Sequence, residues 1–87
     1  MRTFLIAVGL SLAMSSAVLA DAMSDCRAPF ETMAAVDRVI KACTLIIDGR
    51  AKGDKTFAYF RRGFAYSHNW IFDRAIADLN EAIRLNP

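Results

Sequence analysis

The 87-residue chain has few of the side chains from which metal sites and nucleophilic active sites are built. It contains one histidine, His68, and two cysteines, Cys26 and Cys43, and none stands at the spacing of paired metal ligands. A thiol catalyst would need a free, activated cysteine beside His68. A glycine-rich phosphate loop is also missing, because residues 49–53 have neither its spacing nor a preceding strand. These absences predict a protein that is not an enzyme and uses no metal or cofactor.

The chain also lacks a strong net charge, since it carries 11 basic and 9 acidic residues. This balance gives no nucleic-acid footprint, so no nucleic acid is expected as a partner. Asp73, Asp78 and Glu81 are expected on a solvated helix face rather than in an acid–base pair. Five basic residues gather in the middle of the chain, where a solvated loop and helix start is favoured over an anion site: Arg50, Lys52, Lys55, Arg61 and Arg62.

Long apolar runs are missing except at the amino terminus. Arg2 precedes an apolar run over residues 4–14 and a stretch of small residues that ends at Ala20. Val18 and Ala20 suit a secretory cleavage site. The run is shorter than the roughly 20 apolar residues of a membrane span, so a retained anchor is the weaker alternative. Residues 1–20 are therefore predicted to be a signal peptide that is cleaved near Ala20. The protein would reach the periplasm or the cell exterior, and it would meet the membrane only before cleavage.

The last third of the chain has the clearest helical pattern. Tyr59, Gly63 and Tyr66 are spaced four and three residues apart, which places them on one helical face. A second apolar face follows a short break, and its residues are Phe72, Ala75, Ile76, Leu79, Ala82 and Ile83. The pattern predicts helices over 56–68 and 71–85. Because the break is short, the two helices are expected to be antiparallel neighbours that approach closely at Gly63.

This pattern closely resembles one tetratricopeptide repeat, a helix–turn–helix unit of about 34 residues. The matching residues are Tyr59, Gly63, Ala65 and Tyr66 in the first helix, and Phe72, Ala75, Leu79, Ala82 and the closing Pro87 in the second. Arg62 and Trp70 depart from the pattern, which usually has an aliphatic residue at the first position and glycine at the second. The resemblance implies an all-α fold, a right-handed superhelix of antiparallel helical hairpins. This chain would hold about two hairpins, with residues 56–87 as the complete repeat.

Residues 21–55 are expected to form a divergent, partial first repeat and a linker. Its first helix is expected over 23–33, with Pro29 early enough to be tolerated or to mark the helix start. Its second helix is expected over 36–48, where the apolar residues fall on one stripe.

The end of this second helix has a competing interpretation. Residues 44–47 are apolar and β-branched, and Asp48 and Gly49 form a hairpin turn signal. No alternating partner strand follows, so a helix that ends at a Gly49 cap is preferred. Asp54 or Thr56 is then the N-cap of the next helix.

Cys26 and Cys43 are predicted to form a disulfide. Export to an oxidising compartment makes a disulfide the default. Alignment with the downstream repeat places Cys43 on Leu79 and Cys26 on Arg62, so both cysteines fall on the contact surface of one hairpin. This segment resembles the first repeat of exported bacterial repeat proteins that carry a cysteine in each helix. The bridge would close a loop of about 18 residues and stabilise the fold by roughly 3 kcal/mol in the chain-entropy model.

The family resemblance also implies a groove, lined by the first helix of each hairpin, that takes a peptide or protein segment. In the family's register the groove residues are Phe57, Phe60, Arg61, Phe64, Ser67 and His68. The three phenylalanines suggest an apolar groove, although they could instead pack against the first hairpin. The predicted function is an exported protein–protein interaction module without catalysis. The alternative is an accessory repeat segment of a larger exported enzyme or envelope complex.

Repeat units bury their apolar faces against neighbouring units. The face of Tyr66, Ile76 and Ile83 is therefore expected to be partly bare. A longer protein of which this chain is a fragment, self-association, or a partner protein would each explain such a face.

Overall fold

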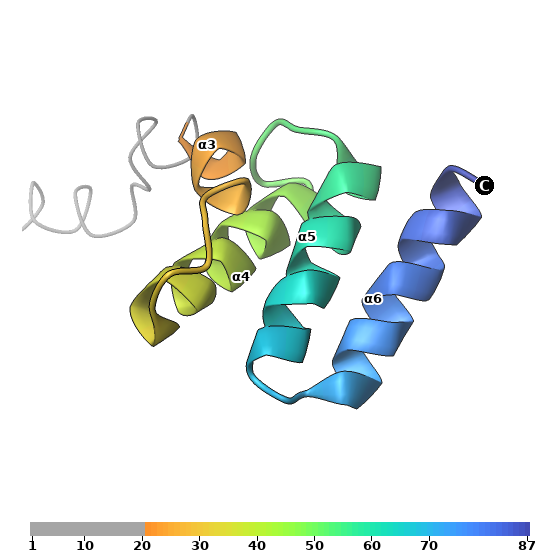
Figure 1. The fold of residues 1–87 in the computed structure, drawn as a ribbon. Coiled ribbons are helices and arrows are strands. Elements are labelled where there is room, and N and C mark those ends of the chain that lie inside the picture. Colours follow the sequence, from red (N-terminus) through yellow and green to blue (C-terminus); the bar gives the residue numbers. More distant parts are fainter. Residues whose placement is uncertain (1–20) are drawn as a thin grey trace, which may run out of the picture.

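The computed structural model describes residues 21–87, and the predicted signal peptide lies outside them. The described residues form four helices and no strand (Figure 1): α3 (Ala22–Cys26), α4 (Met33–Ile47), α5 (Lys55–His68) and α6 (Phe72–Leu85). Helix α5 lies in the middle. Helix α4 packs against one side of α5, and α6 runs antiparallel to α5 on its other side. The expected all-helical fold is confirmed. None of the helices in this part of the chain is long and apolar enough to cross a membrane.

The first predicted helix, over 23–33, is wrong in its extent. Helix α3 ends at Cys26, and the chain is not helical again until after Thr32. Pro29 explains the gap, because it has no N–H and disfavours helical backbone at the residue before it. The Thr32 hydroxyl accepts a hydrogen bond of 3.0 Å from the Ala35 N–H, which caps α4 three residues earlier than expected.

Helix α4 ends in the predicted glycine turn. Gly49 has a φ of 78°, and its N–H donates to the Ile46 carbonyl at 3.0 Å. The Arg50 N–H donates to the Leu45 carbonyl at 2.9 Å, and the two bonds together make a Schellman motif. Residues 44–47 are the last turn of this helix, so the alternative of a strand there is excluded.

Helix α5 begins at an aspartate cap. The Asp54 carboxylate accepts hydrogen bonds from the N–H groups of Thr56 at 2.9 Å and Phe57 at 3.3 Å. Asp54 is therefore the N-cap, and Thr56 lies in the first turn.

The turn between α5 and α6 holds a tryptophan where glycine would suit the backbone. Trp70 has a φ of 62°. Its N–H donates to the Ser67 carbonyl at 3.1 Å, and the Ile71 N–H donates to the Tyr66 carbonyl at 3.0 Å. This is the same Schellman pattern as at Gly49. A side chain in the left-handed region costs about 1–2 kcal/mol, so the sequence departure at Trp70 corresponds to real backbone strain.

The apolar core lies between α3, α4 and α5. The predicted disulfide between Cys26 and Cys43 is present, and it joins α3 to α4 with both cysteines fully buried. Val39 and Ile46 are the largest fully buried side chains besides the cysteines. The core continues into α5 through Ala58 and Ala65, and the smaller residues around them are Ala22, Val36, Ala42 and Ala51. Residues 21–87 thus carry a core of their own.

Helices α5 and α6 approach closely at Gly63. A Cβ atom at this position would lie 3.0 Å from Cγ of Leu79 and 3.2 Å from the carbonyl oxygen of Ala75. The expected role of Gly63 in letting two backbones come together is therefore confirmed.

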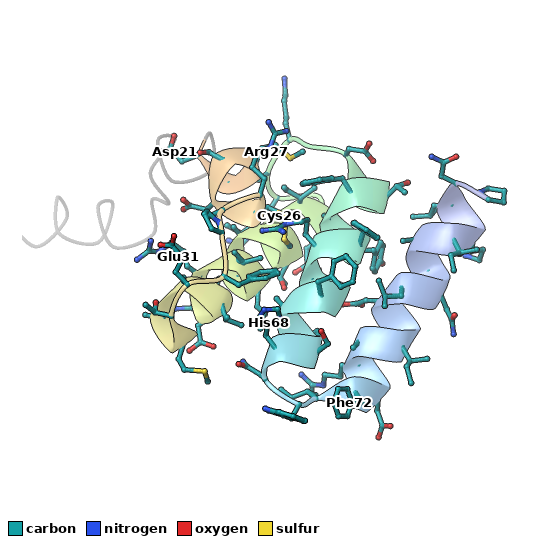
Figure 2. The ribbon with its side chains drawn as sticks, viewed as in Figure 1. Asp21, Cys26, Arg27, Glu31, His68 and Phe72 are labelled. Carbon is teal, nitrogen blue, oxygen red and sulfur yellow. A yellow bond between two sulfur atoms is a disulfide. The ribbon has the colours of Figure 1, made fainter. Side chains whose placement is uncertain are left out.

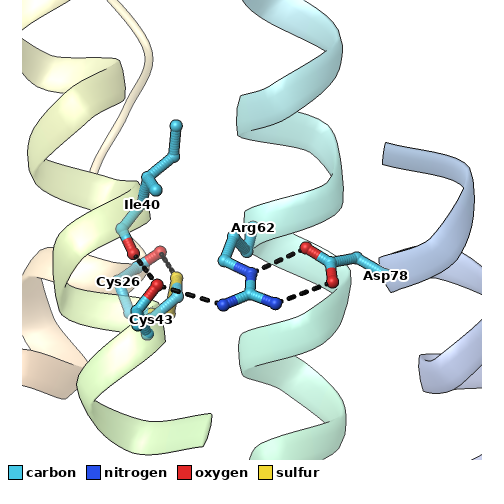
Figure 3. Close-up of polar contacts among 6 residues, drawn as sticks. Cys26, Ile40, Cys43, Arg62 and Asp78 are labelled. Atoms are coloured by element: carbon cyan, nitrogen blue, oxygen red, sulfur yellow. Dashed lines mark hydrogen bonds and ion pairs between the residues drawn. A yellow bond between two sulfur atoms is a disulfide. The ribbon is translucent and has the colours of Figure 1, made fainter. Parts of the chain in front are cut away.

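Arg62, the other departure from the repeat pattern, joins three helices (Figure 3). Its guanidinium donates two hydrogen bonds to the Asp78 carboxylate, of 2.7 Å from Nε and 2.9 Å from Nη2. Nη1 donates to the Thr44 hydroxyl at 3.1 Å. The hydrogen bonds to Asp78 raise the pKa of Arg62, and burial of the guanidinium opposes them.

The expectation that Asp78 lies on a solvated face is wrong, since only 6% of this residue is exposed. Helical spacing places it between Ala75 and Ala82, on the side of α6 that meets α5. Such burial of a carboxylate is tolerable because Arg62 supplies both the opposite charge and the hydrogen bonds.

Candidate interaction site

The main concave feature of the described residues is an open groove between α5 and α6, of about 590 Å³. We call it the apolar groove. It is lined by Asp54, Thr56, Phe57, Phe60 and Phe64 on the α5 side and by Leu79, Ala82, Ile83 and Asn86 on the α6 side. Its walls are mostly apolar, as is usual for sites that bind apolar ligands or protein segments.

The phenylalanines reach the apolar groove because of their spacing in α5. Phe57, Phe60 and Phe64 follow one another at three and four residues, so they share one face of the helix. Phe60 is 43% exposed and Phe64 is 40% exposed, and their rings make an edge-on contact at 4.6 Å between centroids. Large aromatic rings left this open on a small protein are a typical sign of an interaction surface.

The opposite wall comes partly from the contact of α6 with α5, at Leu79 and Ala82, and partly from the neighbouring face of α6, at Ile83. The sequence pattern groups six apolar residues of this helix on one face, but the structure divides them by size. Ala75 and Ala82 are buried against α5 together with Asp78. The larger residues lie on the neighbouring face, the outer stripe: Phe72, Ile76, Leu79 and Ile83. Of these, Leu79 also contacts α5 at Gly63.

The outer stripe is well exposed except at Leu79, which is half-buried. Ile76 is 58% exposed and Ile83 is 62% exposed, as expected for the partly bare face, whereas Tyr66 is 9% exposed and does not belong to it. Tyr66 is covered because it lies beside the guanidinium groups of Arg62 and Arg74, at 5.6 and 5.8 Å from the ring centroid. Figure 2 shows Phe72 at the start of α6, next to the turn that joins it to α5.

The apolar groove has almost no charge. Asp54 is its one charged lining residue, and the carboxylate already accepts two N–H groups as the cap of α5. The groove therefore offers neither a cation nor a free row of hydrogen-bond donors for a phosphate or a carboxylate ligand. Its chemistry suits apolar side chains.

The structure separates the six predicted groove residues into two groups. Phe57, Phe60 and Phe64 line the apolar groove, but Arg61, Ser67 and His68 do not. The Ser67 hydroxyl is used locally, since it donates to the Phe64 carbonyl at 2.7 Å.

Arg61 and His68 meet the non-helical segment 27–32 that connects α3 to α4. Arg61 Nε donates to the Cys26 carbonyl at 3.0 Å, and Nη2 donates to the Ala28 carbonyl. The Phe30 ring lies against both side chains, at 4.4 Å from the Arg61 guanidinium and 4.6 Å from the His68 ring centroid. Burial lowers the pKa of Arg61. This side of α5 is thus occupied by the chain itself.

Leu79, Ala82 and Ile83 are groove residues that the sequence pattern did not assign to the site. The sequence pattern placed all three on the apolar face of the second helix, and Ile83 also on the partly bare face. The exposure of Ile83 could have been anticipated from the two different apolar stripes of α6, one of small and one of large residues.

Residues 21–87 contain no cluster of three or more histidine, cysteine or acidic side chains that could hold a metal ion. Both cysteines of the chain are bonded to each other.

Comparison with models of protein families found no match, and comparisons with curated proteins and with solved structures found no significant similarity. The site is therefore interpreted from its own geometry.

Proposed function

We propose that this chain is an exported, tetratricopeptide-like interaction module whose apolar groove binds an amphipathic helix of a protein partner. The module would act by binding, without catalysis and without a cofactor. The observation that carries the proposal is the pair of exposed phenylalanines, Phe60 and Phe64, facing the exposed Ile83 across a groove without free charge.

The shape of the groove favours a helix as its occupant. It is bordered by two antiparallel helices of 14 residues each, which at 1.5 Å per residue run for roughly 20 Å. An amphipathic helix of similar length can lay apolar side chains, spaced three and four residues apart, along such a groove. The match of Tyr59, Gly63 and Ala75 to the repeat signature supports the proposed class, because such repeats stack helix on helix.

The amino-terminal sequence supports the proposed location. A positive start, a short apolar run and small residues before position 21 are typical of a secretory signal. The buried disulfide between Cys26 and Cys43 suits an oxidising compartment such as the periplasm.

A titration with helical peptides tests the proposed binding. One labelled peptide carries large apolar side chains at spacings of four, three and four, and a second has the same composition in scrambled order. Fluorescence anisotropy should show saturable binding of the first peptide to residues 21–87 and much weaker binding of the second. Equal binding of both peptides, or none, would contradict the proposal.

A matched pair of variants locates the binding. Phe64→Lys places a charge in the apolar groove, whereas Ala77→Lys places it at an exposed site of α6 that does not line the groove. Phe64→Lys should weaken peptide binding about tenfold or more, which corresponds to about 1.4 kcal/mol. Ala77→Lys should leave it unchanged.

A further inference from the structure

Helix α6 carries two apolar stripes, although within residues 21–87 it packs mainly against one helix, α5. Ala75, Asp78 and Ala82 are buried and face α5. The outer stripe runs from Phe72 to Ile83, and Phe72 is 50% exposed. A surface helix normally has one apolar stripe, directed to one core. A second stripe of large residues indicates a second helical neighbour.

The spacing of the outer stripe shows which neighbour fits it. Phe72, Ile76, Leu79 and Ile83 are separated by four, three and four residues, the spacing of a seam between paired helices. This order reads the same from either end of the helix. An antiparallel copy of α6 therefore presents its side chains at matching heights. Phe72 of one copy would face Ile83 of the other, and Ile76 would face Leu79.

We propose that the groove's partner is a second copy of this chain, bound by antiparallel pairing of α6 with its own copy about a two-fold axis. This inference rests on the proposed function, since the second α6 would lie over the apolar groove. Leu79 and Ile83 belong to both the groove and the outer stripe, so the two surfaces are continuous. The two-fold axis makes each copy contribute the same patch.

The exposed apolar area suits a small, weak interface of this kind. Phe60, Phe64, Phe72, Ile76 and Ile83 are each 40–62% exposed. If each large side chain has a surface of roughly 200 Å², the five side chains together expose roughly 500 Å² of apolar surface per copy. A standard interface buries about 800 Å² per partner, and its polar rim supplies the remainder. None of the five side chains is charged, so two facing copies meet no like-charge repulsion at the centre.

Sedimentation of residues 21–87 at increasing concentration tests the pairing. We expect a reversible monomer–dimer equilibrium with a dissociation constant on the order of 10–100 μM, at the weak end for specific interfaces. Ile76→Glu should weaken dimerisation at least about tenfold, because the charge would be buried in both copies. Since Ile76 is 58% exposed, the monomer should remain folded, which circular dichroism verifies. Ala77→Glu adds the same charge to α6 outside the outer stripe and should leave the dimer intact.

Cysteine cross-linking tests the antiparallel register. Under mild oxidation, a Phe72→Cys variant mixed with an Ile83→Cys variant should form a mixed disulfide faster than either variant forms one with itself. Faster self-linking of each variant would indicate parallel pairing and overturn the proposed geometry.

The outcomes separate this inference from the proposed function. A protein that stays monomeric at millimolar concentration but binds the spaced peptide would overturn the pairing and leave the groove's function intact. A monomer that binds neither peptide would overturn both. A dimer that is unaffected by Ile76→Glu would use another surface and would also contradict the inference.

Discussion

The strained turn at Trp70 offers a sharp test of the structure, because the backbone angle and the side chain can be tested separately. Trp70→Ala removes the ring but keeps the Cβ atom, and Trp70→Gly removes both. The φ of 62° penalises any Cβ atom. Glycine should therefore be more stable than alanine at this position by about 1 kcal/mol, even though glycine has more conformational freedom in the unfolded chain.

The ring itself contributes little. Trp70 is 79% exposed, and its ring makes an edge-on contact with Phe72 at 5.7 Å between centroids. Such contacts contribute about 0.5–1.5 kcal/mol when buried, so an exposed one belongs at the low end. The expected order of stability is Trp70→Gly first, then the natural chain, and Trp70→Ala last.

Urea unfolding followed by far-ultraviolet circular dichroism measures the three stabilities. Tryptophan fluorescence cannot serve, because Trp70 is the only tryptophan of the chain. For a domain of this size, 1 kcal/mol corresponds to a shift of about 4–8 °C in melting temperature. Equal stability of the glycine and alanine variants would show that residue 70 does not adopt a positive φ, and would refute the account of this turn.

Three further substitutions test the interior. Gly63→Leu should destabilise the fold by about 1–3 kcal/mol through overpacking, and an unchanged melting temperature would place Gly63 outside the contact between helices. Asp78→Ala should lower the free energy of unfolding by about 2–3 kcal/mol, because it leaves the half-buried Arg62 unpaired. Combining Asp78→Ala with Arg62→Leu should recover most of that stability. A double variant as unstable as the single one would contradict this. Replacing Cys26 and Cys43 together by alanine should cost roughly 3 kcal/mol in urea unfolding. Two free thiols in protein purified from an oxidising compartment would contradict the disulfide.

Local signals in the sequence were sufficient for α5, α6 and the end of α4, although α4 begins three residues earlier than expected. The glycine turn at Gly49, the aspartate cap at Asp54 and the close approach at Gly63 follow from backbone chemistry that a few neighbouring residues determine. The disulfide between Cys26 and Cys43 was also predictable, even though the helix that carries Cys26 is shorter than expected.

Contacts between distant segments were not predictable in this way. The non-helical segment 27–32 lies against Arg61 and His68, and the periodicity of α5 does not predict this contact. The predicted groove consequently divides. Only its phenylalanines line the open groove, and of these Phe60 and Phe64 are exposed while Phe57 also packs against the core. Burial of Asp78 depends likewise on Arg62, which lies 16 residues away in another helix. Contacts between residues so far apart in the sequence are determined by the packing of the helices rather than by the local sequence pattern.

The central claim, that the apolar groove binds an apolar helix, is tested most directly by nuclear magnetic resonance. Isotope-labelled residues 21–87 would be titrated with the unlabelled helical peptide that carries large apolar side chains at spacings of four, three and four. The account predicts shifts of the amide signals along the groove face, at residues 57–64 of α5 and 79–86 of α6, with little change in segment 27–32. Shifts centred on His68 and segment 27–32, or none at all, would contradict it.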